Sequence, residues 1–247
     1  MKRFFVHACV LMVAFIYCNC IKNSPAGPED PGEPDAGIMT GNDGTVYTTV
    51  KIGDRWWLAE NLRETLYRNG DGIANVTDPV EWEGLTTGAR CVYEKKESNT
   101  EICGYLYNRH VVNDSRNIAP EGWCVPTDED WKALDMVLGM SREKADQGGY
   151  RGTEEGSKLA GDAESWNSGA LKSDPAFGRS GFSALPGGCR NISGGGYFQL
   201  GNHAYFWSGS TFGTQSAWYR HEYPGVIRSY TNKRNGFSVR LVLRSTV

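Results

Sequence analysis

Short motifs of aromatic residues, glycine and proline recur in order along this chain from Trp56 to Val242. They read WWLAENL (Trp56–Leu62), LTTGARCVY (Leu85–Tyr93), GYLYN (Gly104–Asn108), EGWCVPTDEDW (Glu121–Trp131), GFSALPGG (Gly181–Gly188), FWSGS (Phe206–Ser210) and GFSVRLV (Gly236–Val242). The chain also holds 31 glycines and 12% aromatic residues, and glycine is unfavourable inside helices. The pattern predicts a compact, tryptophan-rich module with little regular helix.

The N-terminus has the features of an export signal. Two cations precede an apolar run from Phe4 to Tyr17, which is shorter than the roughly 20 residues of a membrane span. The residues before Cys20 suit an ordinary signal peptidase poorly, whereas a cysteine at the end of the apolar run resembles a bacterial lipobox. We therefore predict a lipoprotein signal peptide at residues 1–19 and acylation of Cys20. Cys18 is the rival anchor, and a plain secreted protein is the alternative.

A segment rich in proline, glycine and acidic residues follows, from Ser24 to Gly37. It has too few apolar residues to bury a core, so we predict that residues 20–40 form a disordered tether. Residues 41–247 suit a single domain. The net charge of the chain is −3 and no run of Lys and Arg exists, which argues against nucleic acid as a partner.

One helix is clearly signalled. Thr127 can cap its start together with Asp130, and acidic residues occupy the first turn, where the helix dipole favours them. Trp131, Leu134 and Leu138 then fall on one helix face. We expect this helix to end at Gly139.

Three strand signals stand out. Thr45–Ile52 and Arg55–Leu58 flank a Gly-Asp turn and predict a hairpin. Ala89–Tyr93 and Gly104–Tyr107 flank a polar loop and predict a second hairpin. Phe237–Leu243 predicts a central strand.

In their order and spacing these motifs resemble the Fibrobacter succinogenes major paralogous (FISUMP) domain, which is common in lipoproteins of Bacteroidetes and Fibrobacteres. The resemblance extends from Gly44 to Val242 and includes GTVYTTVKIGDRWWLAENLRETLYRNGDGI (Gly44–Ile73) and APEGWCVPTDEDWKAL (Ala119–Leu134). The family looks related to C-type lectins and, more distantly, to formylglycine-generating enzymes. The resemblance implies an α+β, C-type-lectin-like fold of small twisted antiparallel sheets, one or two helices and long loops. It implies no established activity.

The predicted domain holds four cysteines, and an even number in an exported chain suggests disulfides. Cys91 and Cys103 flank the second hairpin, so a bridge between them is plausible and would leave Cys124 with Cys189. The family usually has His at position 124 and Tyr at position 189, and this joint departure suggests that Cys124 and Cys189 touch. We expect the pairs Cys91–Cys103 and Cys124–Cys189, with four free thiols as the alternative.

Signals of catalysis or metal binding are weak. Formylglycine-generating enzymes use a reactive cysteine pair near their last strand, and the matching stretch Val226–Arg240 has no cysteine. The histidines outside the signal are isolated and form no zinc motif, so we expect no metal, no cofactor and no catalytic residue. The loop Asn69–Gly72 suits a tight turn, with a calcium site as the less favoured interpretation.

The eight tryptophans divide into two groups. Those within the motifs are expected in the core, whereas Trp82, Trp166 and Trp218 lie in more polar contexts. An exposed indole can stack on a sugar or anchor a protein partner, although packing under long loops would also explain these positions. Together with the polar and aromatic segment that begins at Trp218, they give these predicted binding residues: Trp218, Tyr219, Arg220, His221, Tyr223, Arg228, Trp82 and Trp166.

These observations predict a non-catalytic recognition module, lipid-anchored at the outer membrane or cell surface of a Gram-negative bacterium. Its expected partners are a glycan or protein ligand and, through the acyl anchor, the lipid bilayer. One alternative is a structural lipoprotein subunit of an envelope or adhesive assembly. Another is an enzyme on a fold like that of the formylglycine-generating enzymes.

Overall fold

The computed structural model describes residues 36–222 and 225–244 and shows a mixed α+β architecture. Within these residues the chain forms 14 strands and seven short α-helices, so helix is more frequent than the one or two helices expected. The predicted signal peptide, Cys18, Cys20 and the predicted disordered tether up to residue 35 lie outside the described residues. The last part of the predicted tether, residues 36–40, forms a strand instead, because it pairs antiparallel with residues 46–50. None of the described helices is long and apolar enough to cross a bilayer.

The first and the last described strands belong to the same five-stranded sheet, whose strand order is β1-β2-β3-β14-β7. Its strands are β1 (Ala36–Thr40), β2 (Val46–Ile52), β3 (Arg55–Leu58), β14 (Val242–Leu243) and β7 (Trp123–Cys124). The predicted hairpin is confirmed, because β2 and β3 pair antiparallel across a turn at Gly53. Gly53 has a φ of +64°, which favours glycine.

A six-stranded sheet has the order β10-β9-β11-β12-β13-β8. Its strands are β10 (Tyr197–Leu200), β9 (Gly187–Arg190), β11 (Ala204–Phe212), β12 (Ser216–Glu222), β13 (Val226–Asn232) and β8 (Gly149–Arg151). Strands β11, β12 and β13 form an antiparallel meander whose register breaks between Trp207 and Thr211. This meander provides most of the side chains considered below.

A three-stranded sheet joins β4 (Ala74–Asn75), β5 (Ala89–Cys91) and β6 (Leu106–Tyr107). The antiparallel pairing of β5 with β6 confirms the second predicted hairpin. The connection between them is more ordered than expected, since it holds a 3-10 turn at Tyr93–Lys95 and α2 (Ser98–Cys103).

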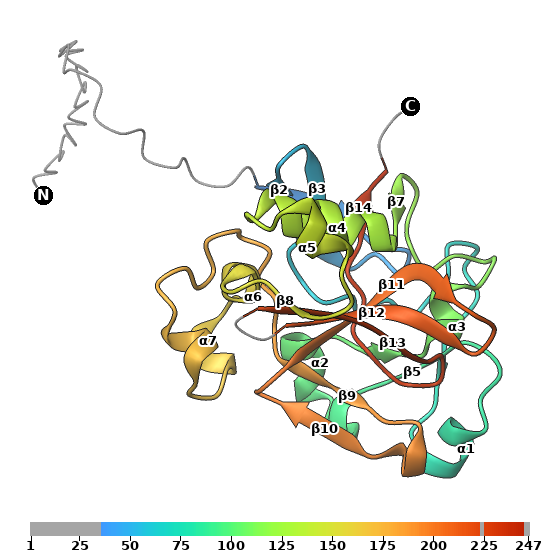
Figure 1. Ribbon diagram of the computed structural model, residues 1–247. Coiled ribbons are helices and arrows are strands. Elements are labelled where there is room, and N and C mark those ends of the chain that lie inside the picture. The colour runs from blue at the N-terminus through green and yellow to red at the C-terminus, as the bar shows by residue number, and fades with distance from the viewer. Residues whose placement is uncertain (1–35, 223–224, 245–247) are drawn as a thin grey trace, which may run out of the picture. The chain divides into compact units, whose positions relative to one another are not determined.

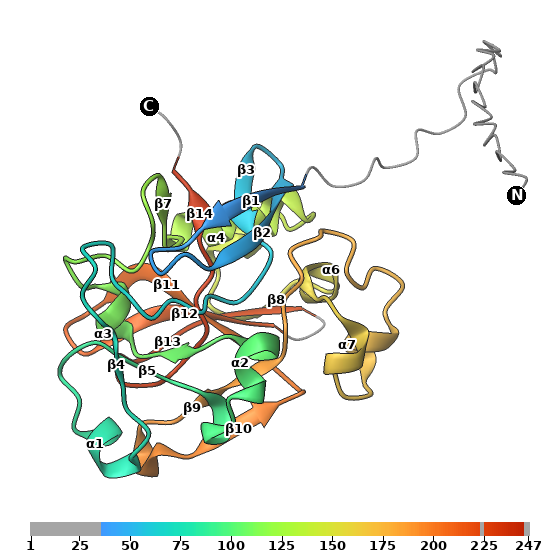
Figure 2. The same ribbon diagram turned by 180° about the vertical axis from the view of Figure 1, so that it is seen from behind.

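The longest described helix is α4 (Asp128–Val137), and it matches the prediction. Thr127 and Asp130 form the expected capping box. The remaining helices are α1 (Pro79–Glu83), α3 (Arg109–Val112), α5 (Arg142–Asp146), α6 (Glu155–Leu159) and α7 (Ala170–Ser173). Figures 1 and 2 show α4 between the β2–β3 hairpin and the β11–β12 strands, where Trp131 packs in one buried cluster with Trp57 and Phe206.

The C-terminal segment Phe237–Leu243 corrects one prediction. Only Val242 and Leu243 lie in a regular strand, β14, between β3 and β7. The preceding residues are buried and bond to several sheets in turn: Phe237 exchanges backbone hydrogen bonds with Tyr107, and Ser238 bonds to β11. The segment is central, as expected, but it joins the sheets together instead of lying within one of them.

Candidate functional site

The carboxylate of Asp128, the first residue of α4, accepts hydrogen bonds from two arginines of the six-stranded sheet. Arg220 donates from Nη1 to Oδ1 at 2.9 Å, and Arg228 donates from Nη2 to Oδ2 at 2.6 Å. The two arginines are directly opposite each other on β12 and β13, so they share one sheet face. Burial raises the pKa of Asp128, but the hydrogen bonds and charges of Arg228 and Arg220 outweigh it and hold that pKa below its usual value.

A second pair lies deeper in the same interface. Arg151 on β8 donates from Nη2 to Oδ2 of Asp135 at 2.9 Å, and both side chains are buried. Burial raises the pKa of Asp135 in spite of the neighbouring charges of Arg220 and Arg151. Arg220 is itself completely buried, so this predicted binding residue fixes the helix to the sheet.

Three aromatic side chains, the aromatic patch, lie beyond the arginines on the same sheet face: Phe212, Trp218 and Tyr230. Phe212 and Tyr230 stack with 3.8 Å between ring centroids, and Trp218 meets both edge-on at 5.0 and 5.8 Å. Phe212 is 39% and Tyr230 52% exposed. The guanidinium of Arg228 lies 4.0 Å from the Trp218 ring centroid, so the outer surface of the patch is formed mainly by Phe212 and Tyr230.

The alternation of strand side chains explains this grouping. Trp218 is opposite Tyr230 in the β12–β13 register, and Phe212 is opposite Ser216 in the β11–β12 register. Ser216 and Asn232 lie on the same face and give the patch a neutral polar rim. Sequence reasoning missed Phe212. Tyr230 ends the predicted binding segment Trp218–Tyr230 but was not named among the binding residues. The two-residue spacing of Phe212 from Ser210 and of Tyr230 from Arg228 was available as a signal.

Tyr219 and His221 occupy the opposite face of β12. The His221 ring lies 4.3 Å from the Tyr205 ring and 4.2 Å from the His203 ring, and Tyr219 contacts Phe237. Burial, and then the proximity of His203, lowers the pKa of His221 to about 3. His221 is therefore a neutral, packed imidazole at physiological pH, and it does not adjoin the aromatic patch.

The other predicted binding residues are distributed elsewhere. Trp82 is completely buried, its Nε1 donates to the carbonyl of Arg234 at 2.8 Å, and Arg190 covers its ring. Trp166 is also buried and donates to the carbonyl of Gly161. Tyr223 lies outside the described residues.

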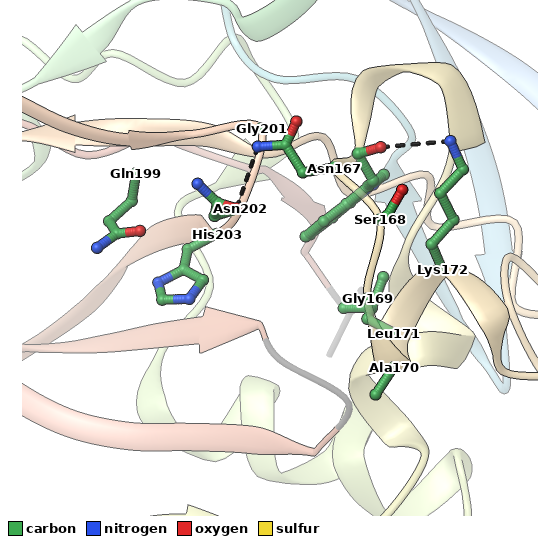
Figure 3. Close-up of a pocket in the computed structure, with 11 residues that line it drawn as sticks. Asn167, Ser168, Gly169, Ala170, Leu171, Lys172, Gln199, Gly201, Asn202 and His203 are labelled. Carbon is green, nitrogen blue, oxygen red and sulfur yellow. Dashed lines mark hydrogen bonds between the residues drawn. The ribbon is translucent and has the colours of Figure 1, made fainter.

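A pocket of about 440 Å³ separates the α7 segment from the turn between β10 and β11. Figure 3 shows Asn167 and Lys172 on one wall, with Asn202 and His203 on the other. Asn167 connects the two walls, because its side chain donates to the side-chain oxygen of Asn202 at 3.1 Å and its backbone N–H donates to the carbonyl of Gly201 at 2.8 Å. Lys172 donates to the carbonyl of Trp166 on its own wall at 3.3 Å. Burial lowers the pKa of His203, and no carboxylate is among the described residues that line this pocket.

A comparison with protein families covers most of the described chain. The family model described as the Fibrobacter succinogenes major domain matches residues 50–243. The chain belongs to this family. The match contains the aromatic patch, Asp128 and both arginines of the cluster. No curated protein and no solved structure matches the chain.

The cysteines of this major domain are free thiols, which corrects the expected disulfides. Cys124 lies on β7 of the five-stranded sheet and Cys189 on β9 of the six-stranded sheet, and they pack against different core clusters. Cys91 and Cys103 are also free: the Cys91 sulfur faces Arg190 and Tyr197, and Cys103 is the last residue of α2.

Burial raises the pKa of every one of these thiols, to about 11 for Cys103 and about 12 for Cys189. Protonated thiols are poor nucleophiles. Among the described residues of the major domain, no group of three or more His, Cys, Asp or Glu side chains is arranged to hold a metal ion. The loop Asn69–Gly72 forms a turn in which the Asn69 side chain accepts from the Asp71 N–H.

Proposed function

We propose that this protein is a lipid-anchored, non-catalytic recognition module of the Gram-negative cell envelope, and that it binds a glycan through the aromatic patch. The observation that carries the proposal is the exposed, stacked pair of Phe212 and Tyr230. A pyranose ring presents a flat C–H face that packs against an aromatic ring, and its hydroxyls can bond to the Ser216 and Asn232 rim. The membrane anchor would be Cys20, at the outer membrane or cell surface.

The size of the patch favours a sugar over a protein. Two half-exposed rings offer on the order of 200 Å² of accessible surface. A stable protein interface takes about 800 Å² from each partner. One or two sugar rings fit the smaller area.

The surroundings of the patch hold it rigid. Arg228 packs on Trp218 and is bonded to Asp128, while Trp218 supports both exposed rings. A surface that is already ordered loses little conformational entropy on binding. This rigidity suits a recognition role.

The remaining parts of the proposal follow from charge and fold. Asp128 and Asp135 are occupied by arginines, and the thiols are held protonated by burial, which favours binding over catalysis. We include a C-type-lectin-like arrangement in the proposal. Its support is the combination of small antiparallel sheets, the capped helix α4 and long connections.

The test is a glycan-array screen with the full chain in detergent, followed by affinity measurements on variants. Each ring contributes on the order of 1 kcal/mol, so Phe212→Ala or Tyr230→Ala should weaken the best glycan about five-fold and the double variant about 30-fold. Phe198→Ala is the matched control, since Phe198 is an equally exposed ring on β10 of the same sheet. Equal affinity of the double variant and the wild type would refute the role of the patch. Capture of a protein but no glycan would favour a structural subunit.

A further inference from the structure

Four basic side chains gather around the turn that follows β13. Lys233 and Arg234 lie in this turn, and Arg109 and His110 begin α3. The Arg109 N–H donates to the carbonyl of Lys233 at 2.7 Å, which fixes the two segments together. Burial lowers the pKa of His110, and the charges of Lys233, Arg234 and Arg109 lower it further.

Arg109 is the unusual member of this group. It is completely buried, and its Nη2 donates to the carbonyl of Gly209 at 2.6 Å. Its Nε and Nη1 have no hydrogen-bond partner among the described residues, and no described carboxylate lies within ion-pair distance. Burial lowers the pKa of this guanidinium to about 10. A buried cation without a counter-ion is costly. Arg109 does not line the neighbouring pocket, so it acts there only through its charge.

A pocket of about 310 Å³ opens in the same place, with His110, Thr214, Gln215, Asn232, Lys233 and Arg234 among its lining residues. No acidic side chain lines it. Lys233 Nζ donates to the carbonyl of Thr214 at 2.7 Å, and Arg234 Nη1 donates to the carbonyl of Glu83 at 2.6 Å. Each cation is held in place by one bond and keeps further N–H donors for a ligand.

The pocket and the aromatic patch lie at the same end of the sheet. Thr214 follows Phe212 by two residues on the β11–β12 hairpin, and Asn232 follows Tyr230 by two residues on β13. Figures 1 and 2 show α3 beside this hairpin. Helix α3 packs on the opposite face, since Val111 shares a buried cluster with Trp207 and Ala217. An extended ligand on the patch would therefore reach the basic turn by passing around the tip of the β11–β12 hairpin.

We propose that this basic pocket binds an oxyanion, a carboxylate or sulfate group, carried by an acidic saccharide whose ring packs on the aromatic patch. Guanidinium and ammonium groups bind such oxygens through charge-assisted hydrogen bonds. The inference rests on the proposed function and specifies its ligand class. The positive charge is local, because the chain as a whole carries a net charge of −3.

The first experiment follows the His110 imidazole by NMR in the full chain, with sodium sulfate added at constant ionic strength. A bound oxyanion offsets the charges of Lys233, Arg234 and Arg109, so the pKa of His110 should rise. Arg234→Gln and Lys233→Gln should each abolish the rise, whereas Lys144→Gln, an exposed cation on α5, should leave it intact. Thermal unfolding of each variant shows that it is folded. An unchanged pKa of His110 in sulfate would overturn the pocket assignment.

The second experiment compares a uronic-acid oligosaccharide with its carboxyl-reduced, neutral counterpart by calorimetry. The acidic form should bind about ten-fold more tightly, and Arg234→Gln should remove the difference. The two forms could instead bind equally well, with binding lost in the Phe212→Ala, Tyr230→Ala double variant. That result would overturn this inference and leave the proposed function standing. Binding of sulfate without binding of any saccharide would retain the oxyanion pocket and remove the glycan role.

Discussion

The guanidinium of Arg228 lies over the indole of Trp218, with 4.0 Å between the guanidinium carbon and the ring centroid. Its nitrogens also donate to both carboxylate oxygens of Asp128 at 2.6 to 3.1 Å. One side chain thus connects the start of α4 to the centre of the aromatic patch. Stability and ligand recognition therefore depend on the same residue.

Replacement of Arg228 with alanine should lower the free energy of unfolding by about 3 kcal/mol, because Asp128 loses a nearly buried partner and Trp218 loses its cover. Urea unfolding measures this loss. Arg142→Ala, which removes an exposed cation, is the control and should have a much smaller effect. Equal effects of the two substitutions would show that the Arg228 contacts contribute no more than a surface ion pair.

Asp128→Asn should change how the free energy of unfolding depends on pH. The folded-state pKa of Asp128 is below its unfolded value, so its ionisation stabilises the protein above the unfolded pKa and this contribution is lost as pH falls through the folded pKa. The variant should be less stable at pH 7 and should lose less stability below about pH 4. Urea midpoints at pH 3, 4 and 7 test this. Parallel curves for variant and wild type would contradict it.

Glu64 should have the opposite pH dependence. It is completely buried, and burial followed by the charge of Asp43 raises its pKa to about 7 from 4.5. The protonated form stabilises the fold below about pH 4.5, and that contribution is lost as pH rises to about 7. Between pH 4 and pH 8, the free energy of unfolding of Glu64→Gln should therefore rise by about 3 kcal/mol relative to that of the wild type. Glu143→Gln, an exposed control, should show no such gain in urea unfolding.

The four cysteines of the domain should be reactive only after unfolding. Alkylation in denaturant without a reductant should label Cys91, Cys103, Cys124 and Cys189 individually, as seen by mass spectrometry. Labelling of the native protein should be slow, since burial raises each thiol pKa. A cross-linked peptide containing Cys124 and Cys189 would contradict the structure.

Cys20→Ser should release the protein from membranes, because stable attachment requires the several acyl chains of a lipobox cysteine. Cell fractionation measures the release, and mass spectrometry of the N-terminal peptide identifies the lipid. Cys18→Ser is the control and should remain membrane-bound. The reverse result would move the anchor to Cys18.

The elements predicted correctly are those with local signals. The helix start depends on Thr127 and Asp130, three residues apart, and the first hairpin depends on a turn with glycine at position 53. Such features need no information from distant parts of the chain. The disulfides were predicted wrongly for the converse reason: a shared departure of Cys124 and Cys189 from the family pattern does not place them together in space.

The candidate site likewise combines a feature that local sequence indicates with one that depends on distant parts of the chain. The segment from Trp218 to Tyr230 was recognised, but its alternate residues point to opposite faces of β12 and β13. Helix α4 covers the part of the patch's own face that holds Arg220 and Arg228, through Asp128. The spacing of Phe212 and Tyr230 along the strands indicates their shared face, but only the position of the helix shows that this part of the face is exposed.

The backbone of the single segment Gly236–Leu243 supplies hydrogen-bond partners to β3, β6, β7, β9 and β11. Without it, backbone groups in the middle of the domain lack hydrogen bonds. The three sheets therefore cannot be joined as described until this one segment has docked against all of them.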